Sequence, residues 1–300
     1  MLIRVLGGFL MALADSVPGV SGGTIAFLMG IYDEFIGSLN NIVSKDKEKR
    51  KAAVLFLVKL GSGWIIGMAM ASIIINQIFE KHIYNISSLF IGFVLFAMPI
   101  IIMEEKESIV GRYYNIVFSL IGAAVVVAVA YFSVHGVLGN GIDLAWGHFG
   151  LGVGIYLFVT AMFAISAMVL PGISGSTLLL VFGLYQAVIG AVSSFFKLDF
   201  TYLPALIIFG CGVIAGILTV VKVLSYGLKK KRSAMMYFIL GMMIGSFYAI
   251  VIGPASLKDN PQPPMTLETF NVWFFLIGGV VIFGLQFLKT MVDKRDAAKK

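Results

Sequence analysis

Long apolar stretches, separated by short polar gaps, run along almost the whole chain. A bilayer core of about 30 Å needs roughly 20 apolar residues of helix, so these stretches predict membrane-spanning helices. The polar gaps between them are too short to fold as soluble domains. The sequence therefore predicts an all-α polytopic membrane protein, with six spans near 52–78, 87–103, 114–132, 202–224, 233–252 and 270–288.

Composition agrees with this prediction. Hydrophobic residues make up 59% of the 300 and charged residues 12%, and the mean hydropathy is +0.99. A soluble domain with a hydrated surface does not have such a composition. Binding or chemistry is therefore expected in or beside the membrane, with membrane lipids as neighbours and no nucleic acid as a partner.

One sequence motif occurs twice, which indicates an internal repeat. PGVSGGT at 18–24 returns as PGISGST at 171–177. Matches at a similar offset continue along the chain: Gly30, Tyr32 and Gly37 with Gly183, Tyr185 and Gly190, 60–67 with 209–216, Gly92 with Gly241, and 114–126 with 270–281. The chain is thus predicted to consist of two related halves, 1–140 and 141–300, each with a motif segment followed by three spans.

Lys and Arg in short loops mark the cytoplasmic side of a membrane protein. The basic clusters at 45–51, 229–232 and 289–300 are therefore expected inside the cell, together with both termini. In this threading the loop after the first motif segment is cytoplasmic and the loop after the second is external, so the halves are inverted repeats. Each motif segment must then enter and leave on one side, as a re-entrant helical hairpin or as two full crossings. The short first arm, 2–17, favours the hairpin.

The motif predicts a break in a helix followed by a new helix N-terminus. Proline stops the first arm, and the serine after it is a natural N-cap. The next residues are small and leave backbone N–H groups open, and such an end attracts anions. We expect phosphate binding by Ser21, Gly22, Gly23, Thr24, Ser174, Gly175, Ser176 and Thr177, with the backbone shaped by Pro18, Gly19, Pro171 and Gly172. Close helix packing by the small residues is the alternative.

The doubled motif, with GIYDEF after the first copy and GLYQAV after the second, resembles a bacterial membrane family formerly of unknown function. That family is associated with polyprenyl-phosphate (undecaprenyl-phosphate) translocation, and the resemblance covers essentially the whole chain. It implies a transporter in the bacterial cytoplasmic membrane. The implied substrate is the lipid carrier monophosphate of cell-wall synthesis, returned from the outer to the inner leaflet.

Three charged residues near the first motif are candidates for ion coupling or phosphate contact. Asp15 lies three residues before Pro18, where a carboxylate at membrane depth is costly. It is predicted either to bind H⁺ or Na⁺ or to cap backbone N–H groups. Arg4 and Lys59 are expected to extend to the interface or to meet the phosphate. Asp33 and Glu34 are expected about 14 Å further along the same helix, as a solvated pair.

Two other classes of protein compete with a lipid transporter. A transporter or channel for a small soluble anion would use the same paired motifs. A membrane enzyme acting on a lipid phosphate would need clustered His, Asp and Arg or a bound metal. The histidines are scattered and lack metal-ligand spacing, so we expect no catalytic residues, no metal and no cofactor.

Overall fold

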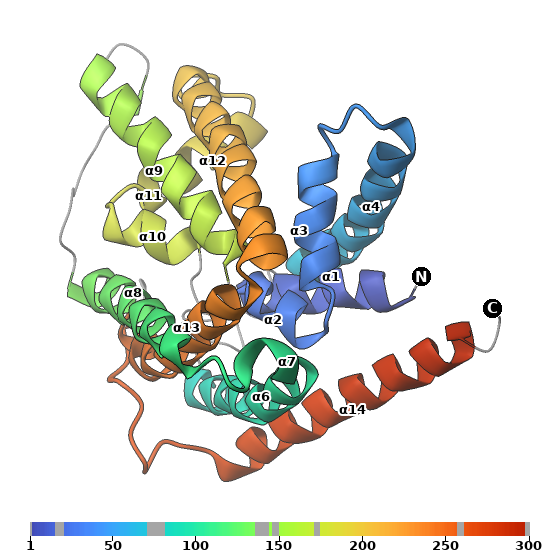
Figure 1. Ribbon diagram of the computed structural model, residues 1–300. Coiled ribbons are helices and arrows are strands. Elements are labelled where there is room, and N and C mark those ends of the chain that lie inside the picture. Colours follow the sequence, from blue (N-terminus) through green and yellow to red (C-terminus); the bar gives the residue numbers. More distant parts are fainter. Residues whose placement is uncertain are drawn as a thin grey trace.

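The computed structural model describes residues 2–15, 21–70, 82–135, 144–145, 150–170, 175–256 and 261–297 (Figure 1). Every regular element within these ranges is a helix, which confirms the all-α prediction. The first half contains α1 (Leu2–Asp15), α2 (Gly22–Leu28), α3 (Tyr32–Asn41), α4 (Lys47–Met70), α6 (Ile83–Glu104), α7 (Lys106–Ile109), η2 (Tyr113–Asn115) and α8 (Ile116–His135). The second contains α9 (Leu151–Val169), α10 (Gly175–Val181), α11 (Tyr185–Phe196), α12 (Leu203–Lys230), α13 (Arg232–Ile252), η3 (Gly253–Ser256) and α14 (Val272–Ala297).

Six helices of the described part are long and apolar enough to cross a membrane. Five of them coincide with predicted spans: α4, α6, α8 with η2, α12 and α13. The sixth is α9, which the sequence placed in the second motif segment. The last predicted span, 270–288, falls in α14, a helix of 26 residues. A multi-pass membrane protein is confirmed, and α9 is a span-length helix that the sequence analysis did not count among the spans.

Each motif segment contains a second break that the sequence reasoning did not place. α2 ends at Leu28 and α3 starts at Tyr32, because Gly30 adopts a φ of 67°. Gly183, at the corresponding position, has a φ of 66° between α10 and α11. A left-handed glycine commonly ends a helix in this way. The prediction that Asp33 and Glu34 continue the helix of Thr24 is therefore wrong, since both lie in the first turn of α3.

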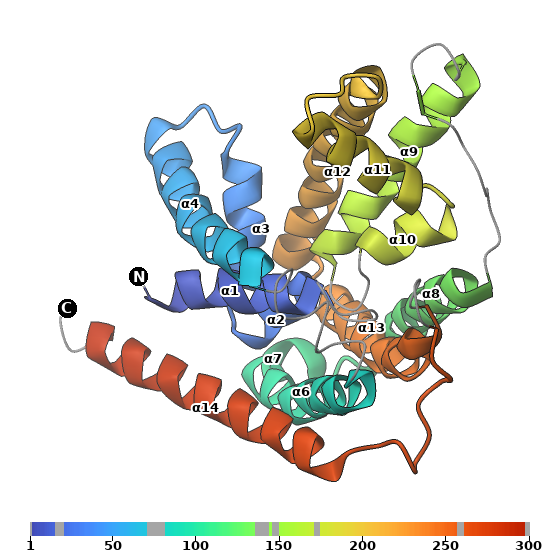
Figure 2. The ribbon, with the colours of Figure 1, turned by 180° about the vertical axis from the view of Figure 1, so that it is seen from behind.

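The helices pack in two groups (Figures 1 and 2). In the first, α1 packs on α4, α9 packs on α12, and α3 lies against α4 and α12. We call α1–α4 and α9–α12 together the motif unit, because both copies of the motif belong to it. In the second group α6 packs on α14 and α8 on α13, with α6 also touching α13. We call α6, α7, α8, α13 and α14 the bundle unit.

Glycines at aligned positions bring the helices of each pair into close contact. A Cβ atom on Gly63 would lie 1.9 Å from the Val5 carbonyl oxygen, and one on Gly212 would lie 2.4 Å from the Phe158 carbonyl oxygen. The bundle unit repeats the pattern, with Gly92 against Phe275 and Gly241 against Ser119. Small residues allow helix backbones to approach in this way within a membrane. Positions that match in sequence therefore make matching contacts.

Candidate functional site

The two motif segments meet where α2 begins and α9 ends. Ser21 Oγ donates a hydrogen bond to the Leu170 carbonyl oxygen at 3.1 Å, and Leu170 directly precedes Pro171 of the second motif. A Cβ atom on Gly23 would lie 2.8 Å from the Val169 carbonyl oxygen, so only glycine fits there. The hydroxyl of Tyr32 also donates to Val169 O, at 3.1 Å. The start of the first motif's second helix thus lies against the residue before the second motif.

Ser21 is the N-cap of α2, as the sequence predicted. Its backbone is extended and its Oγ accepts a hydrogen bond from Thr24 N at 3.2 Å. The Oγ atoms of Ser21 and Thr24 lie 3.1 Å apart. Both side chains are buried, with exposed fractions of 0% and 1%. The start of α2 is therefore buried inside the protein.

Asp15 binds the backbone N–H of Gly22, a group that the sequence analysis assigned to phosphate binding. Its Oδ1 accepts a hydrogen bond from Gly22 N at 2.7 Å, and its Oδ2 accepts one from Trp64 Nε1 at 3.1 Å. The carboxylate caps α2 across the motif, which is one of the two predicted roles of Asp15. A carboxylate and a phosphate oxygen are both hydrogen-bond acceptors, so they compete for the same N–H.

The second motif segment has no carboxylate at the corresponding position. Gly175 opens α10 and is buried, and a Cβ atom there would lie 2.8 Å from Ala164 O and 3.4 Å from Met168 Cβ. Met168 aligns with Asp15. The two helix starts therefore have different surroundings, one anionic and one apolar. Outside the described residues lie Pro18, Gly19, Pro171, Gly172, Ser174 and the side chains of Ser176 and Thr177.

Arg4 and Lys59, the basic residues near the first motif, lie on α1 and α4. Arg4 Nη2 lies 2.6 Å from Glu34 Oε1, and its guanidinium lies over the Phe56 ring at 5.2 Å from the centroid. These contacts join α1 to α3 and α4 and do not direct Arg4 toward the helix start of α2. Lys59 is half-buried in α4 and forms no ion pair with a described carboxylate.

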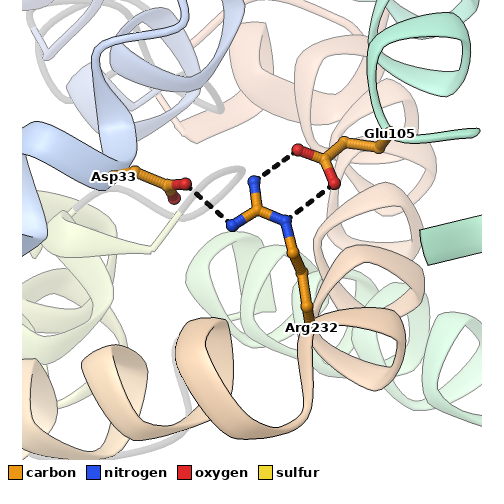
Figure 3. A network of polar contacts seen from close by, with 3 residues as sticks. All are labelled: Asp33, Glu105 and Arg232. Carbon is orange, nitrogen blue, oxygen red and sulfur yellow. Dashed lines mark hydrogen bonds and ion pairs between the residues drawn. The ribbon is translucent and has the colours of Figure 1, made fainter. Parts of the chain in front are cut away.

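An ion cluster joins the first motif segment to the bundle unit (Figure 3). Arg232 Nη1 donates to Asp33 Oδ2 at 2.9 Å, while Nε and Nη2 of the same guanidinium donate to the two oxygens of Glu105. Asp33 and Glu34 are both exposed, as the predicted solvated pair would be, and each also binds an arginine. Arg232 was interpreted only as part of a cytoplasmic basic cluster. No local signal indicates a partner 199 residues away.

Comparison with known proteins places the chain in a family. A family model described as undecaprenyl phosphate translocase-like matches residues 11–262. The chain belongs to this family. Within it, a "Polyprenyl-phosphate transporter" of Staphylococcus aureus is 34% identical over 283 residues, covering 93% of this chain and 94% of the relative.

A second relative from a distant bacterium supports the same assignment. A "Polyprenyl-phosphate transporter" of Vibrio cholerae is 31% identical over 255 residues, covering 82% of this chain and 76% of the relative. No solved structure matches the chain. The resemblance drawn from the doubled motif is therefore confirmed at the level of the family.

Proposed function

We propose that this chain transports polyprenyl phosphate across the bacterial cytoplasmic membrane. Family membership and relatives named polyprenyl-phosphate transporters at 31–34% identity support the substrate. The observation that carries the site is the contact of Ser21 and Gly23 with the end of α9 at Val169 and Leu170, because it brings the first motif against the residues that lead into the second. The direction is from the outer to the inner leaflet, which recycles the undecaprenyl carrier for cell-wall synthesis.

The proposed topology is a pair of inverted repeats, 1–140 and 141–300, with both termini in the cytoplasm. The matching glycine contacts of α1 with α4 and of α9 with α12 support two equivalent halves. The inversion rests on the distribution of Lys and Arg. α1 has 14 residues, about 21 Å, which suits a re-entrant arm. α9 has 19 residues, about 28 Å, which suits a full crossing.

The proposed phosphate site consists of the two helix starts after the motif prolines. The ligands are Ser21, Gly22, Gly23, Thr24, Ser174, Gly175, Ser176 and Thr177, with their backbone shaped by Pro18, Gly19, Pro171 and Gly172. Arrangements of this kind, in which broken helices meet, bind anionic groups in inverted-repeat transporters. The burial of Ser21 and Thr24 indicates that the structure represents a closed state.

Asp15 is the proposed coupling residue. While ionised, its carboxylate holds Gly22 N–H and repels a phosphate group. A proton on Asp15 removes the negative charge and weakens this contact, so the phosphate oxygen takes its place. Both observed donors to Asp15 are N–H groups, from Gly22 and Trp64, whereas Na⁺ is a hard cation that prefers oxygen ligands. We therefore assign H⁺ as the coupled ion in preference to Na⁺.

The test is leaflet transfer in proteoliposomes containing the purified chain. Polyprenyl phosphate should move between leaflets, whereas the uncharged polyprenol of the same length should not be accelerated. Inorganic phosphate, added outside, should not accumulate in the lumen. Uptake of inorganic phosphate without lipid transfer would instead identify a small-anion transporter, and release of inorganic phosphate from the lipid would identify an enzyme.

A further inference from the structure

A hydrophobic core extends across the boundary between the motif unit and the bundle unit. A continuous hydrophobic core contains residues from both units, among them Met11 and Ile25 of the motif unit and Phe90 and Ile239 of the bundle unit. The helices also touch where α8 meets α10. Packed apolar helices slide past each other with small side-chain adjustments. Such a boundary stabilises the assembly without fixing a single relative position.

A charged contact crosses this boundary beside the connection from α12 to α13. α12 of the motif unit ends at Lys230, α13 of the bundle unit starts at Arg232, and Lys231 alone joins them. Arg232 binds Asp33 of α3, which is in the motif unit (Figure 3). The contact therefore lies next to the shortest of the three chain connections between the units, where it ties α3 directly to the start of α13.

Arg232 would remain paired with Glu105 if its contact with Asp33 broke. Its Nε and Nη2 bind both oxygens of Glu105, which is only 18% exposed and lies at the end of α6 within the bundle unit. Bidentate arginine–carboxylate pairs are the stronger kind. The bond to Asp33 is a single one, and the Asp33 side chain is 49% exposed. Of the two contacts, the one that crosses the boundary is therefore the weaker.

The contact has no equivalent in the second half. Gln186 stands at the position that matches Asp33, and Ala187 at the position that matches Glu34. A carboxylate–arginine bond of this kind therefore stabilises one arrangement of the two units. It does not stabilise the arrangement in which the two halves exchange roles. A transporter that alternates between two arrangements needs a contact of this selectivity to favour one of them at rest.

We propose that the motif unit moves relative to the bundle unit during transport and that the Asp33–Arg232 contact holds the closed arrangement, breaking in every cycle. This inference rests on the proposed function. Asp33 and Arg232 are positioning residues, because neither reaches the helix start of α2. Glu105 keeps Arg232 in place while the contact to Asp33 is open.

A reversible cross-link tests the proposal. In a Cys211→Ser background, which removes the one native cysteine, Asp33→Cys and Arg232→Cys are joined by a short reducible bifunctional thiol reagent. Leaflet transfer of polyprenyl phosphate should fall at least tenfold when the residues are joined and return when the link is reduced. Transfer at the same rate before and after reduction overturns the proposal.

The matched control joins two residues of the bundle unit. Gln286 Nε2 of α14 donates to Glu104 Oε1 of α6 at 2.9 Å, next to Glu105. Glu104→Cys joined to Gln286→Cys should transport equally well with and without the link, since neither residue changes units. If this link also stops transfer, general rigidity explains both results and the proposal fails. A parent chain without lipid transfer refutes the proposed function instead.

A distance measurement tests the same movement independently. It needs no transport assay, and it does not replace both Asp33 and Arg232 by cysteine. Spin labels at Val58 of α4 and Met103 of α6, which are 62% and 73% exposed, report on the two units. Asp33→Asn should add a second distance population to that of the parent. Glu34→Gln, which affects only the Arg4 contact inside the motif unit, should not. An unchanged distribution in Asp33→Asn, or the same change in both variants, contradicts the proposal.

Discussion

Ser21 Oγ donates a hydrogen bond to the backbone oxygen of Leu170 at 3.1 Å, although 149 residues separate them in sequence. The contact joins the N-cap of α2, in the first motif, to the end of α9, directly before the second motif. Neither residue is charged, so the contact does not attract phosphate by itself. Its importance is that the start of α2, with its small residues, lies against the end of α9, which leads into the second motif.

Asp15→Asn should remove the pH dependence of phosphate binding that Asp15 contributes. Asparagine keeps the size and an oxygen acceptor for Gly22 N–H but cannot ionise. In the parent, binding of polyprenyl phosphate should strengthen as the pH falls, because a protonated Asp15 no longer repels the phosphate. The lipid phosphate itself titrates near pH 6, so the slopes of the parent and variant must be compared over the same range.

Asp199→Asn is the matched control for this titration. Asp199 lies in the loop between α11 and α12, where hydrogen bonds from the Thr201 hydroxyl and backbone N–H lower the pKa of its carboxyl. It stays ionised throughout the range and should leave the slope unchanged. Equal slopes in the parent and Asp15→Asn would show that Asp15 is only a cap.

Close glycine contacts should make Gly63→Ala and Gly212→Ala destabilising. The added Cβ atoms meet backbone oxygens of α1 and α9, which cannot rotate away as side chains do. We expect a loss of about 1–3 kcal/mol in the free energy of unfolding for each, as for other overpacked sites. Thermal unfolding in detergent measures it. Gly61→Ala and Gly210→Ala, whose Cβ atoms meet nothing within 4 Å, should not lower the melting temperature.

Tyr32→Phe should loosen the junction of the two motif segments. The Tyr32 side chain is 1% exposed and its hydroxyl binds Val169 O, so the variant leaves a buried carbonyl without this donor. The expected cost is about 1–3 kcal/mol of stability. Tyr114→Phe, at a residue that is 76% exposed, should have no measurable effect in the same unfolding assay. A neutral Tyr32→Phe would show that this hydrogen bond does not hold the segments together.

The sequence predicted the features that depend on short-range pattern. Apolar length located five of the six span-length helices, and the serine after a motif proline located the N-cap Ser21. The glycine turn at Gly30 was visible as an aligned residue, but its left-handed backbone was not inferred. A glycine inside an apolar run serves close packing equally well, and only the three-dimensional backbone distinguishes the two roles.

The sequence did not predict which side chains far apart in the chain form hydrogen bonds or ion pairs. Asp15 was identified as a costly charge, yet its bond to Trp64 depends on how α1 packs against α4. The partners of Arg232 were similarly hidden, because Asp33 lies on α3 and Glu105 at the end of α6, far from Arg232 in sequence. One sequence shows which side chains carry charge, while packing of helices far apart in the chain decides which of them meet.

The most direct test of the central claim is equilibrium binding of polyprenyl phosphate to Gly22→Ala and Gly175→Ala, with polyprenol as the competitor that lacks the phosphate. A methyl group on Gly22 would lie 2.8 Å from Asp15 Oδ2, and one on Gly175 would lie 2.8 Å from Ala164 O, so each disturbs its helix start. Each variant should therefore bind at least about tenfold more weakly, or ~1.4 kcal/mol. Gly37→Ala and Gly190→Ala, where a Cβ atom meets nothing within 4 Å, should bind as the parent does. Folded Gly22→Ala and Gly175→Ala proteins that bind the lipid phosphate with parental affinity would contradict the account.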